Sequence, residues 1–191
     1  MPAVTLGSLT WLRAVDHPEL LAPSTFAALA RWAQTEPRIA DEVGVTEIDP
    51  GLADTAAMTS AYDLPLSASA NCVLVAGRRD GAERIAAALV RATTRADVNT
   101  TVKRLLDVRK ASFLPVDRAT TESGMEYGGI TPIGLPTEFR VLVDAAIGER
   151  DAEAGTTVIL GSGLRRSKLA LPGDLLCTAP GFEVVPGLAL G

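Results

Sequence analysis

The chain has 191 residues, of which 47% are hydrophobic and 21% are charged, and its mean hydropathy is +0.22. These values are typical of a globular protein and exclude an intrinsically disordered chain. The formal net charge of −5 and an isoelectric point near 4.9 argue against sequence-independent coating of nucleic acid, which needs a large basic surface.

Nothing along the chain resembles a linker between two domains, so we expect one domain over residues 1–191. The longest apolar stretches, residues 72–76 and 85–90, are far shorter than the roughly 20 residues that span a bilayer. Charged Asp16 and Glu19 lie where a signal peptide would be apolar. We therefore expect a cytoplasmic protein.

Helices are predicted where apolar residues recur at helical spacing behind a proline or a capping side chain. The first of them opens at Pro23-Ser24-Thr25, where a hydroxyl can cap it, and stops near Pro37. The others are a helix opened by Pro50-Gly51 that runs to residue 62, then residues 97–106, residues 117–123 and a short helix opened by Pro172-Gly173-Asp174.

Strands are predicted where β-branched and apolar residues run between turn residues. They are residues 43–48, 71–76, 85–92, 110–114, 139–145, 157–160, 168–171 and 182–185. The second and third of these flank the polar turn 78–81 and should form a hairpin. Periodicity alone also allows a helix over the alanine-rich residues 82–90.

Most familiar catalytic and cofactor sites are excluded by the residue inventory. His17 is the only histidine, so a Ser-His-Asp triad or a histidine-based metal site would rest on it alone. Cys72 and Cys177 lack a nearby second cysteine, which favours reduced, buried thiols and no metal. Gly161-Ser162-Gly163 lacks the remaining residues of a nucleotide-binding loop. We expect no cofactor and no metal.

A shaped loop stands out between residues 124 and 136, which hold Gly124, Gly128, Gly129, Thr131, Pro132, Gly134 and Pro136. Glycines let a backbone approach a ligand closely, and prolines restrict its conformation. The loop is therefore either a backbone site for a carbonyl or carboxylate group, or an ordinary tight turn. In the first case a Cβ at Gly129 would occupy the space of the ligand.

Residues 85–134, the pentapeptide 128–132 (GGITP) and the C-terminal segment VILGSGLRRSKLALPGDLL resemble the YbaK and prolyl-tRNA synthetase-associated editing domain family. The resemblance implies an α/β (α+β) fold with a mixed, mostly antiparallel, barrel-like sheet flanked by helices, and a strand over residues 82–90. It implies hydrolysis of the ester of mischarged tRNA. The GxxxP loop would hold the aminoacyl group, and a ribose hydroxyl of the substrate would assist catalysis.

The chain differs from the family pattern at two positions where the family has a charged residue. Asn71 stands where the family has a lysine, and Lys168 where it has an aspartate, while Gly161, beside Ser162, replaces a family serine. One interpretation is that Lys168 has taken over the lost cation from a neighbouring strand. The alternative is that both positions drifted in a relative without catalytic activity.

The predicted site combines this interpretation with the loop. Candidate catalytic residues are Lys168, Asn71 and Thr131, and candidate substrate-binding residues are Gly128, Gly129, Ile130, Pro132, Gly161, Ser162 and Arg165. The remaining lysines, Lys103 and Lys110, are expected on solvated faces.

The expected partner is the 3′ end of an aminoacyl-tRNA, held by a small basic rim, together with an aminoacyl-tRNA synthetase that could deliver it. Two other functions remain open: an aminoacyl-binding module without turnover, and a small-molecule hydrolase that uses the same loop. The sequence does not indicate which amino acid would be removed.

Overall fold

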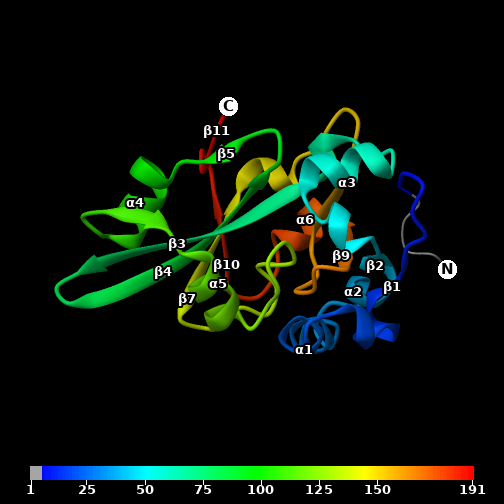
Figure 1. The fold of residues 1–191 in the computed structure, drawn as a ribbon, viewed down its shortest axis with the longest axis horizontal. Coiled ribbons are helices and arrows are strands. Elements are labelled where there is room, and N and C mark those ends of the chain that lie inside the picture. Colours follow the sequence, from blue (N-terminus) through cyan, green and yellow to red (C-terminus); the bar gives the residue numbers. More distant parts are fainter. Residues whose placement is uncertain (1–5) are drawn as a thin grey trace.

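The computed structural model describes residues 6–191, whose strands form three sheets (Figure 1). The strands are β1 (Leu12–Arg13), β2 (Gly44–Glu47), β3 (Ala70–Arg79), β4 (Ala82–Arg91), β5 (Arg95–Ala96), β6 (Ala111–Phe113), β7 (Phe139–Asp144), β8 (Thr157–Gly161), β9 (Ser167–Pro172), β10 (Phe182–Val185) and β11 (Ala189–Leu190). All eight predicted strands are present.

The α-helices are α1 (Pro23–Trp32), α2 (Arg38–Glu42), α3 (Thr55–Ala61), α4 (Lys103–Leu106), α5 (Val116–Ser123) and α6 (Gly173–Leu176). A π-helical turn covers Val98–Val102, and 3₁₀ turns cover Ala14–Asp16, Pro18–Leu20, Pro50–Leu52, Leu66–Ala68 and Ala145–Gly148. Within residues 6–191, none of the helices has the length and hydropathy that crossing a bilayer requires.

The sheets are mixed and mostly antiparallel, as predicted. One has the order β1-β2-β9-β8 and is antiparallel throughout, and a second has the order β10-β7-β4-β3-β6, in which β7 runs parallel to β4 and β10. The short β11-β5 pair forms the third. A parallel bridge between Ser69 and Ile159 joins the first two sheets, which do not close into a barrel.

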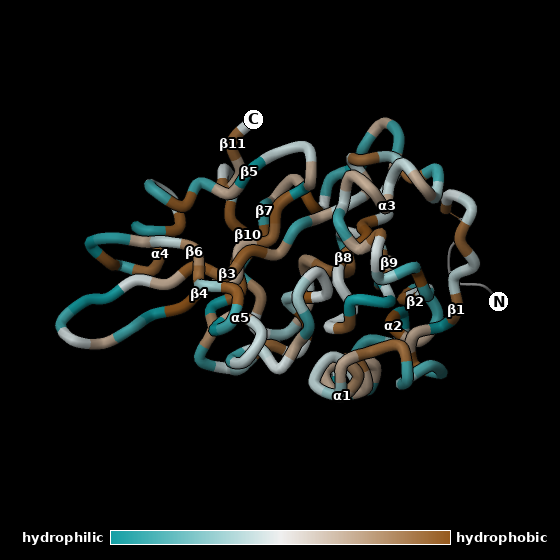
Figure 2. The backbone as a smooth tube through the Cα atoms, in the orientation of Figure 1, coloured by the Kyte–Doolittle hydropathy of each residue, from teal (hydrophilic) through white to brown (hydrophobic). Residues whose placement is uncertain are grey.

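The β3–β4 hairpin is the longest element and extends to one side of the molecule (Figure 1). Its two-residue turn is Asp80-Gly81, and both residues have positive φ, as an Asp-Gly hairpin turn requires. The inner half of β4 is buried on both faces, which explains why residues 86–90 are continuously apolar. Figure 2 shows hydrophobic segments along the central strands and a hydrophilic hairpin tip.

Two predicted helices have different ends from those expected. The first stops at Trp32, and a separate α2 follows Pro37. No side chain caps α1, because its N-cap residue is Ala22. The Thr25 hydroxyl, inside the first turn, donates to the carbonyl of Ile133 in the glycine loop, at 3.2 Å. The segment after Pro50 divides into a 3₁₀ turn and α3, because Asp54 accepts from the amides of Ala56 and Ala57 and starts a new helix.

A buried arginine at the end of β4 ties two connections together. The Arg91 guanidinium donates to the carbonyls of Ser67 at 2.6 Å, Glu149 at 3.1 Å, Ala146 at 3.3 Å and Ile147 at 3.4 Å. Only 7% of the residue is exposed. These bonds fix the turn that precedes β3 against the connection between β7 and β8.

Replacing Arg91→Ala should lower the free energy of unfolding by about 2–4 kcal/mol, because it leaves several buried carbonyls without a charged donor. Urea denaturation measures the change. Arg104→Ala is the matched control, since Arg104 is exposed on α4 and donates to none of the described residues. Equal stability of the two variants would contradict this role for Arg91.

Candidate functional site

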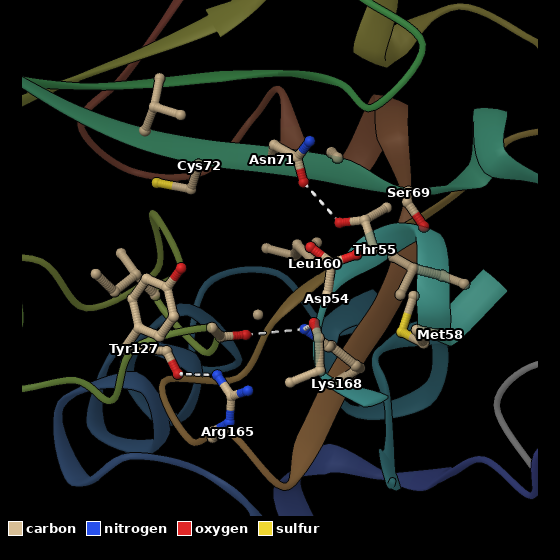
Figure 3. A pocket seen from close by; sticks show the side chains of 17 residues that line it. Asp54, Thr55, Met58, Ser69, Asn71, Cys72, Tyr127, Leu160, Arg165 and Lys168 are labelled. Carbon is tan, nitrogen blue, oxygen red and sulfur yellow. Dashed lines mark hydrogen bonds between the residues drawn. The ribbon is translucent and has the colours of Figure 1, made fainter. Parts of the chain in front are cut away.

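A cleft of about 460 Å³ opens where the two larger sheets meet (Figure 3). It is lined by the start of α3, by the open edge of β3, by the glycine loop and by β8, β9 and the turn between them. The lining residues are Ala53, Asp54, Thr55, Met58, Ser69, Ala70, Asn71, Cys72, Val73, Tyr127, Gly128, Ile130, Ile159, Leu160, Gly161, Arg165 and Lys168. The glycine loop and the turn between β8 and β9 therefore line the same cleft, although they are far apart in the sequence.

Lys168 on β9 is the buried cation of this cleft, with 6% of the residue exposed. Its Nζ donates to the carbonyl of Gly128 at 3.0 Å and to that of Ala53 at 3.1 Å. Burial is the main cause that lowers the pKa of Lys168 to about 8; the charge of Arg165 contributes to this shift, and the charge of Asp54 opposes it. An ammonium carries three donors, so one remains for a ligand.

The glycine loop and the β8–β9 turn are packed backbone against backbone. The Gly163 amide donates to the carbonyl of Gly129 at 2.7 Å, and the Glu126 amide donates to the carbonyl of Gly163 at 2.9 Å. A Cβ at Gly161 would lie 2.2 Å from the carbonyl oxygen of Gly129. Gly161 is required for this close approach, which sets the distance between Lys168 and Gly128.

Arg165 and Tyr127 form the rim of the cleft. The Arg165 guanidinium donates to the carbonyl of Tyr127 at 3.1 Å and lies 5.6 Å from the centre of its ring. Its backbone amide donates to the Glu126 carboxylate at 2.6 Å. Because Tyr127 is 61% exposed, the rim presents an aromatic face and a positive charge to solvent.

Asn71 faces the cleft from β3, opposite Lys168 (Figure 3). The Thr55 hydroxyl donates to Asn71 Oδ1 at 2.9 Å, so the amide nitrogen is directed away from Thr55. The position that the resemblance assigns to a lysine therefore holds a fixed, uncharged donor. The buried cation of this cleft, Lys168, comes from β9 instead.

Four of the predicted site residues lie outside the cleft lining: Gly129, Thr131, Pro132 and Ser162. Thr131 is fully buried, and its Oγ1 accepts from the Ile133 amide at 3.5 Å. Ser162 is also fully buried and bonds to the Ser167 hydroxyl at 2.8 Å. Pro132 lines a separate groove beside Trp32. These residues shape the loop, and Thr131 is not placed to contact a ligand in the cleft.

The structure adds residues that the sequence analysis missed, among them Asp54, Thr55 and Tyr127. Asp54 had a recognisable signal, since an aspartate before a helical segment is a common N-cap. Ser69 carries a buried hydroxyl that has no hydrogen-bond partner among residues 6–191. Burial raises the pKa of the Cys72 thiol to about 12, so Cys72 is a poor nucleophile at neutral pH.

Both cysteines are free thiols, as predicted, although each is only partly buried. Among residues 6–191 no three histidine, cysteine or acidic side chains are grouped as a metal site would need. The cleft thus combines one buried cation, one carboxylate and one amide with backbone carbonyls. Such a set suits a ligand that carries both an ammonium group and a polar oxygen.

The chain is similar to known proteins in both sequence and fold. A family model described as "Aminoacyl-tRNA editing domain" matches residues 49–177, a span that contains every residue of the cleft lining. No curated protein sequence matches the chain significantly.

Several solved structures share the fold. A hypothetical protein has a TM-score of 0.68 and 18% identity over 85% of this chain and 99% of its own. A candidate trans-editing enzyme for prolyl-tRNA synthetase has a TM-score of 0.67 and 18% identity, with coverage of 90% and 99%. A scaffold protein used for computational epitope grafting has a TM-score of 0.67 and 18% identity, over 90% of this chain and 100% of its own.

Position 129 requires a glycine for a different steric reason from the one expected from the sequence. A Cβ at this position would lie 2.4 Å from the backbone of Leu164 and would not meet a ligand in the cleft. Gly129→Ala should therefore lower the free energy of unfolding by about 1–3 kcal/mol through overpacking. Thermal and urea unfolding measure this loss.

Gly81→Ala is the control for Gly129→Ala, because Gly81 has positive φ but open space around its Cα. Its cost should be only that of a left-handed backbone, about 1 kcal/mol. A Gly129→Ala protein of unchanged stability that had lost ligand binding would restore the original expectation.

The lowered pKa of Lys168 predicts how stability depends on pH. Because the folded pKa, about 8, lies below the unfolded value near 10.5, the unfolded chain binds more protons between these limits. Stability therefore rises with pH through this window. From pH 7 to 9.5 the free energy of unfolding of the wild type should increase by about 2 kcal/mol relative to that of Lys168→Met. A difference that is constant with pH, measured by urea unfolding, would disprove the shift.

Proposed function

The chain belongs to the aminoacyl-tRNA editing domain family, and from that premise we propose that it hydrolyses the ester of mischarged tRNA in trans. The observation that carries the proposal is the Lys168 ammonium, held between the carbonyls of Gly128 and Ala53 in the cleft beside the glycine loop. This cation supplies the positive charge that the resemblance places at Asn71.

The cleft has a group for each charge of an aminoacyl ester. In this proposal the third N–H of Lys168 donates to the ester carbonyl oxygen. The α-ammonium group lies near the Asp54 carboxylate, of which one oxygen caps α3 while the other has no partner among the described residues. The Asn71 amide, oriented by Thr55, donates to the ribose or the ester oxygen.

Hydrolysis then proceeds by addition of water to the ester carbon. Negative charge develops on the carbonyl oxygen, where a positioned ammonium stabilises it. The bond from the carbon to the ribose oxygen breaks, that oxygen takes up a proton, and the products are a free amino acid and tRNA. A ribose hydroxyl of the substrate can relay this proton, so the chain needs no histidine of its own.

The same geometry supports a second candidate, an aminoacyl-binding module without turnover. The observation that favours it is the bond between Thr55 and Asn71, which occupies one polar atom at the position of the family lysine. A small-molecule hydrolase remains a third candidate, because the net charge of −5 limits general affinity for RNA.

Contact with tRNA in this proposal is local. Arg165 and Tyr127 at the rim suit the phosphates and bases of a single-stranded 3′ end. A synthetase could supply the remaining affinity by delivering the substrate. Such a substrate places the proposed activity in the cytoplasm, where translation occurs.

Single-turnover deacylation of a panel of mischarged tRNAs tests the proposal. Lys168→Ala and the isosteric Lys168→Met should each lower the rate by on the order of 10²-fold, as loss of an electrostatic stabiliser does. Lys110→Ala, which removes an exposed lysine outside the cleft, should leave it unchanged. Melting temperatures separate chemistry from unfolding.

Two results would overturn the assignment of Lys168. If Lys168→Met hydrolyses the substrate at the wild-type rate, the lysine is a bystander. If the wild type hydrolyses no substrate of the panel but binds a stable aminoacyl analogue, the binding module replaces the enzyme. Asn71→Lys combined with Lys168→Asp should recover part of the activity lost in Lys168→Ala, because it returns the cation to the cleft from β3.

A further inference from the structure

A second cavity, of about 640 Å³, adjoins the cleft across the edge of β3. Asn71 and Val73 line both spaces. Its inner wall is apolar and includes Val90, Val98 and Ala111, whereas its rim carries polar side chains. A slot of this kind suits a flat group with an apolar face and a polar edge.

The strand edge between the two cavities is open. β3 pairs with β4 along its full length, but with β6 only at residues 75–77. The Leu74 carbonyl accepts from the Leu114 amide on that side, so alternation directs the N–H and C=O of Cys72 to the same side. No described strand pairs with Cys72 there, and a ligand can pass from one cavity to the other over polar backbone.

Phe113, the last residue of β6, lines this second cavity and is 63% exposed. A single exposed aromatic residue is common on protein surfaces. This one is unusual in its location, because its ring borders a slot that continues into the cleft. An exposed ring at such a place is a stacking surface for a base.

Arg95 brings positive charge to the rim of the same cavity. Most arginines of the described chain form ion pairs with acidic side chains, whereas Arg95 forms none with residues 6–191. The nearby Asp97 uses both carboxylate oxygens to cap the π-helical turn. The charge of Arg95 is therefore available to a phosphate.

We propose that this second cavity binds the terminal nucleobase of the substrate, stacked on Phe113, with Arg95 facing the adjoining phosphate. The inference rests on the proposed function, since an aminoacyl-tRNA carries its amino acid on the ribose of the terminal adenosine. With the acyl group at Lys168, the ribose lies over Asn71 and the base enters the space beyond β3.

Titration of the ¹⁵N-labelled protein with adenosine 5′-monophosphate tests the inference without any need for turnover. Chemical shifts should change at residues 98–99 and 111–113. Phe113→Ala and Phe113→Leu should weaken binding about 5- to 100-fold, the range typical of a base stacked on an aromatic ring, and Phe113→Trp should retain it. Val184→Ala, which shortens an exposed apolar side chain on β10, is the matched control and should leave binding unchanged.

The outcomes separate this inference from the function on which it rests. Shift changes elsewhere, or equal binding by Phe113→Ala and wild type, would overturn the nucleobase site even if the protein deacylates tRNA. Binding that depends on Phe113 in a protein that hydrolyses no mischarged tRNA would support the site and remove the enzymatic proposal. In an active protein, Phe113→Ala should raise KM for mischarged tRNA at least 5-fold and leave hydrolysis of an aminoacyl methyl ester unchanged.

Discussion

One buried ammonium holds together the three segments that form the cleft. Lys168 on β9 donates to the carbonyl of Ala53, just before α3, and to that of Gly128 in the glycine loop. A buried charge is costly unless polar groups surround it, and here two carbonyls partly replace water. The interaction therefore fixes the cleft and at the same time keeps a cation inside it.

Close backbone contacts position Lys168 and the two carbonyls that it contacts. Gly161 allows β8 to lie directly against the glycine loop, because a side chain there would separate them, and the Gly163 amide donates to the Gly129 carbonyl. Asp54 interrupts the helical segment after Pro50, which leaves the Ala53 carbonyl free for Lys168. Since the Ser69–Ile159 bridge joins the two larger sheets at the same place, the cleft lies at their junction.

The sequence predicted the strands better than the site. Runs such as 71–76 and 139–145 carry their own signal, because β-branched residues and flanking turn residues act locally. Helix ends were harder, since Thr25 bonds to a loop more than a hundred residues away and does not cap α1. The sequence located Asn71, Gly128, Gly161, Arg165 and Lys168, all of which line the cleft. Gly129, Thr131, Pro132 and Ser162 lie outside the lining, and no local pattern shows which side of a glycine-rich loop is buried.

The cleft and its proposed chemistry depend on Lys168 being a buried cation with a lowered pKa, and this pKa can be measured directly. The chain has only three lysines, and Lys103 and Lys110 lie outside the cleft lining, so their NMR signals can be assigned with single substitutions. Titration of ¹³Cε-labelled lysine should show one signal with a pKa of about 8 that is absent in Lys168→Met. A Lys168 signal that titrates at the ordinary lysine pKa, about 10.4, would contradict the buried cation on which the cleft and its proposed chemistry depend.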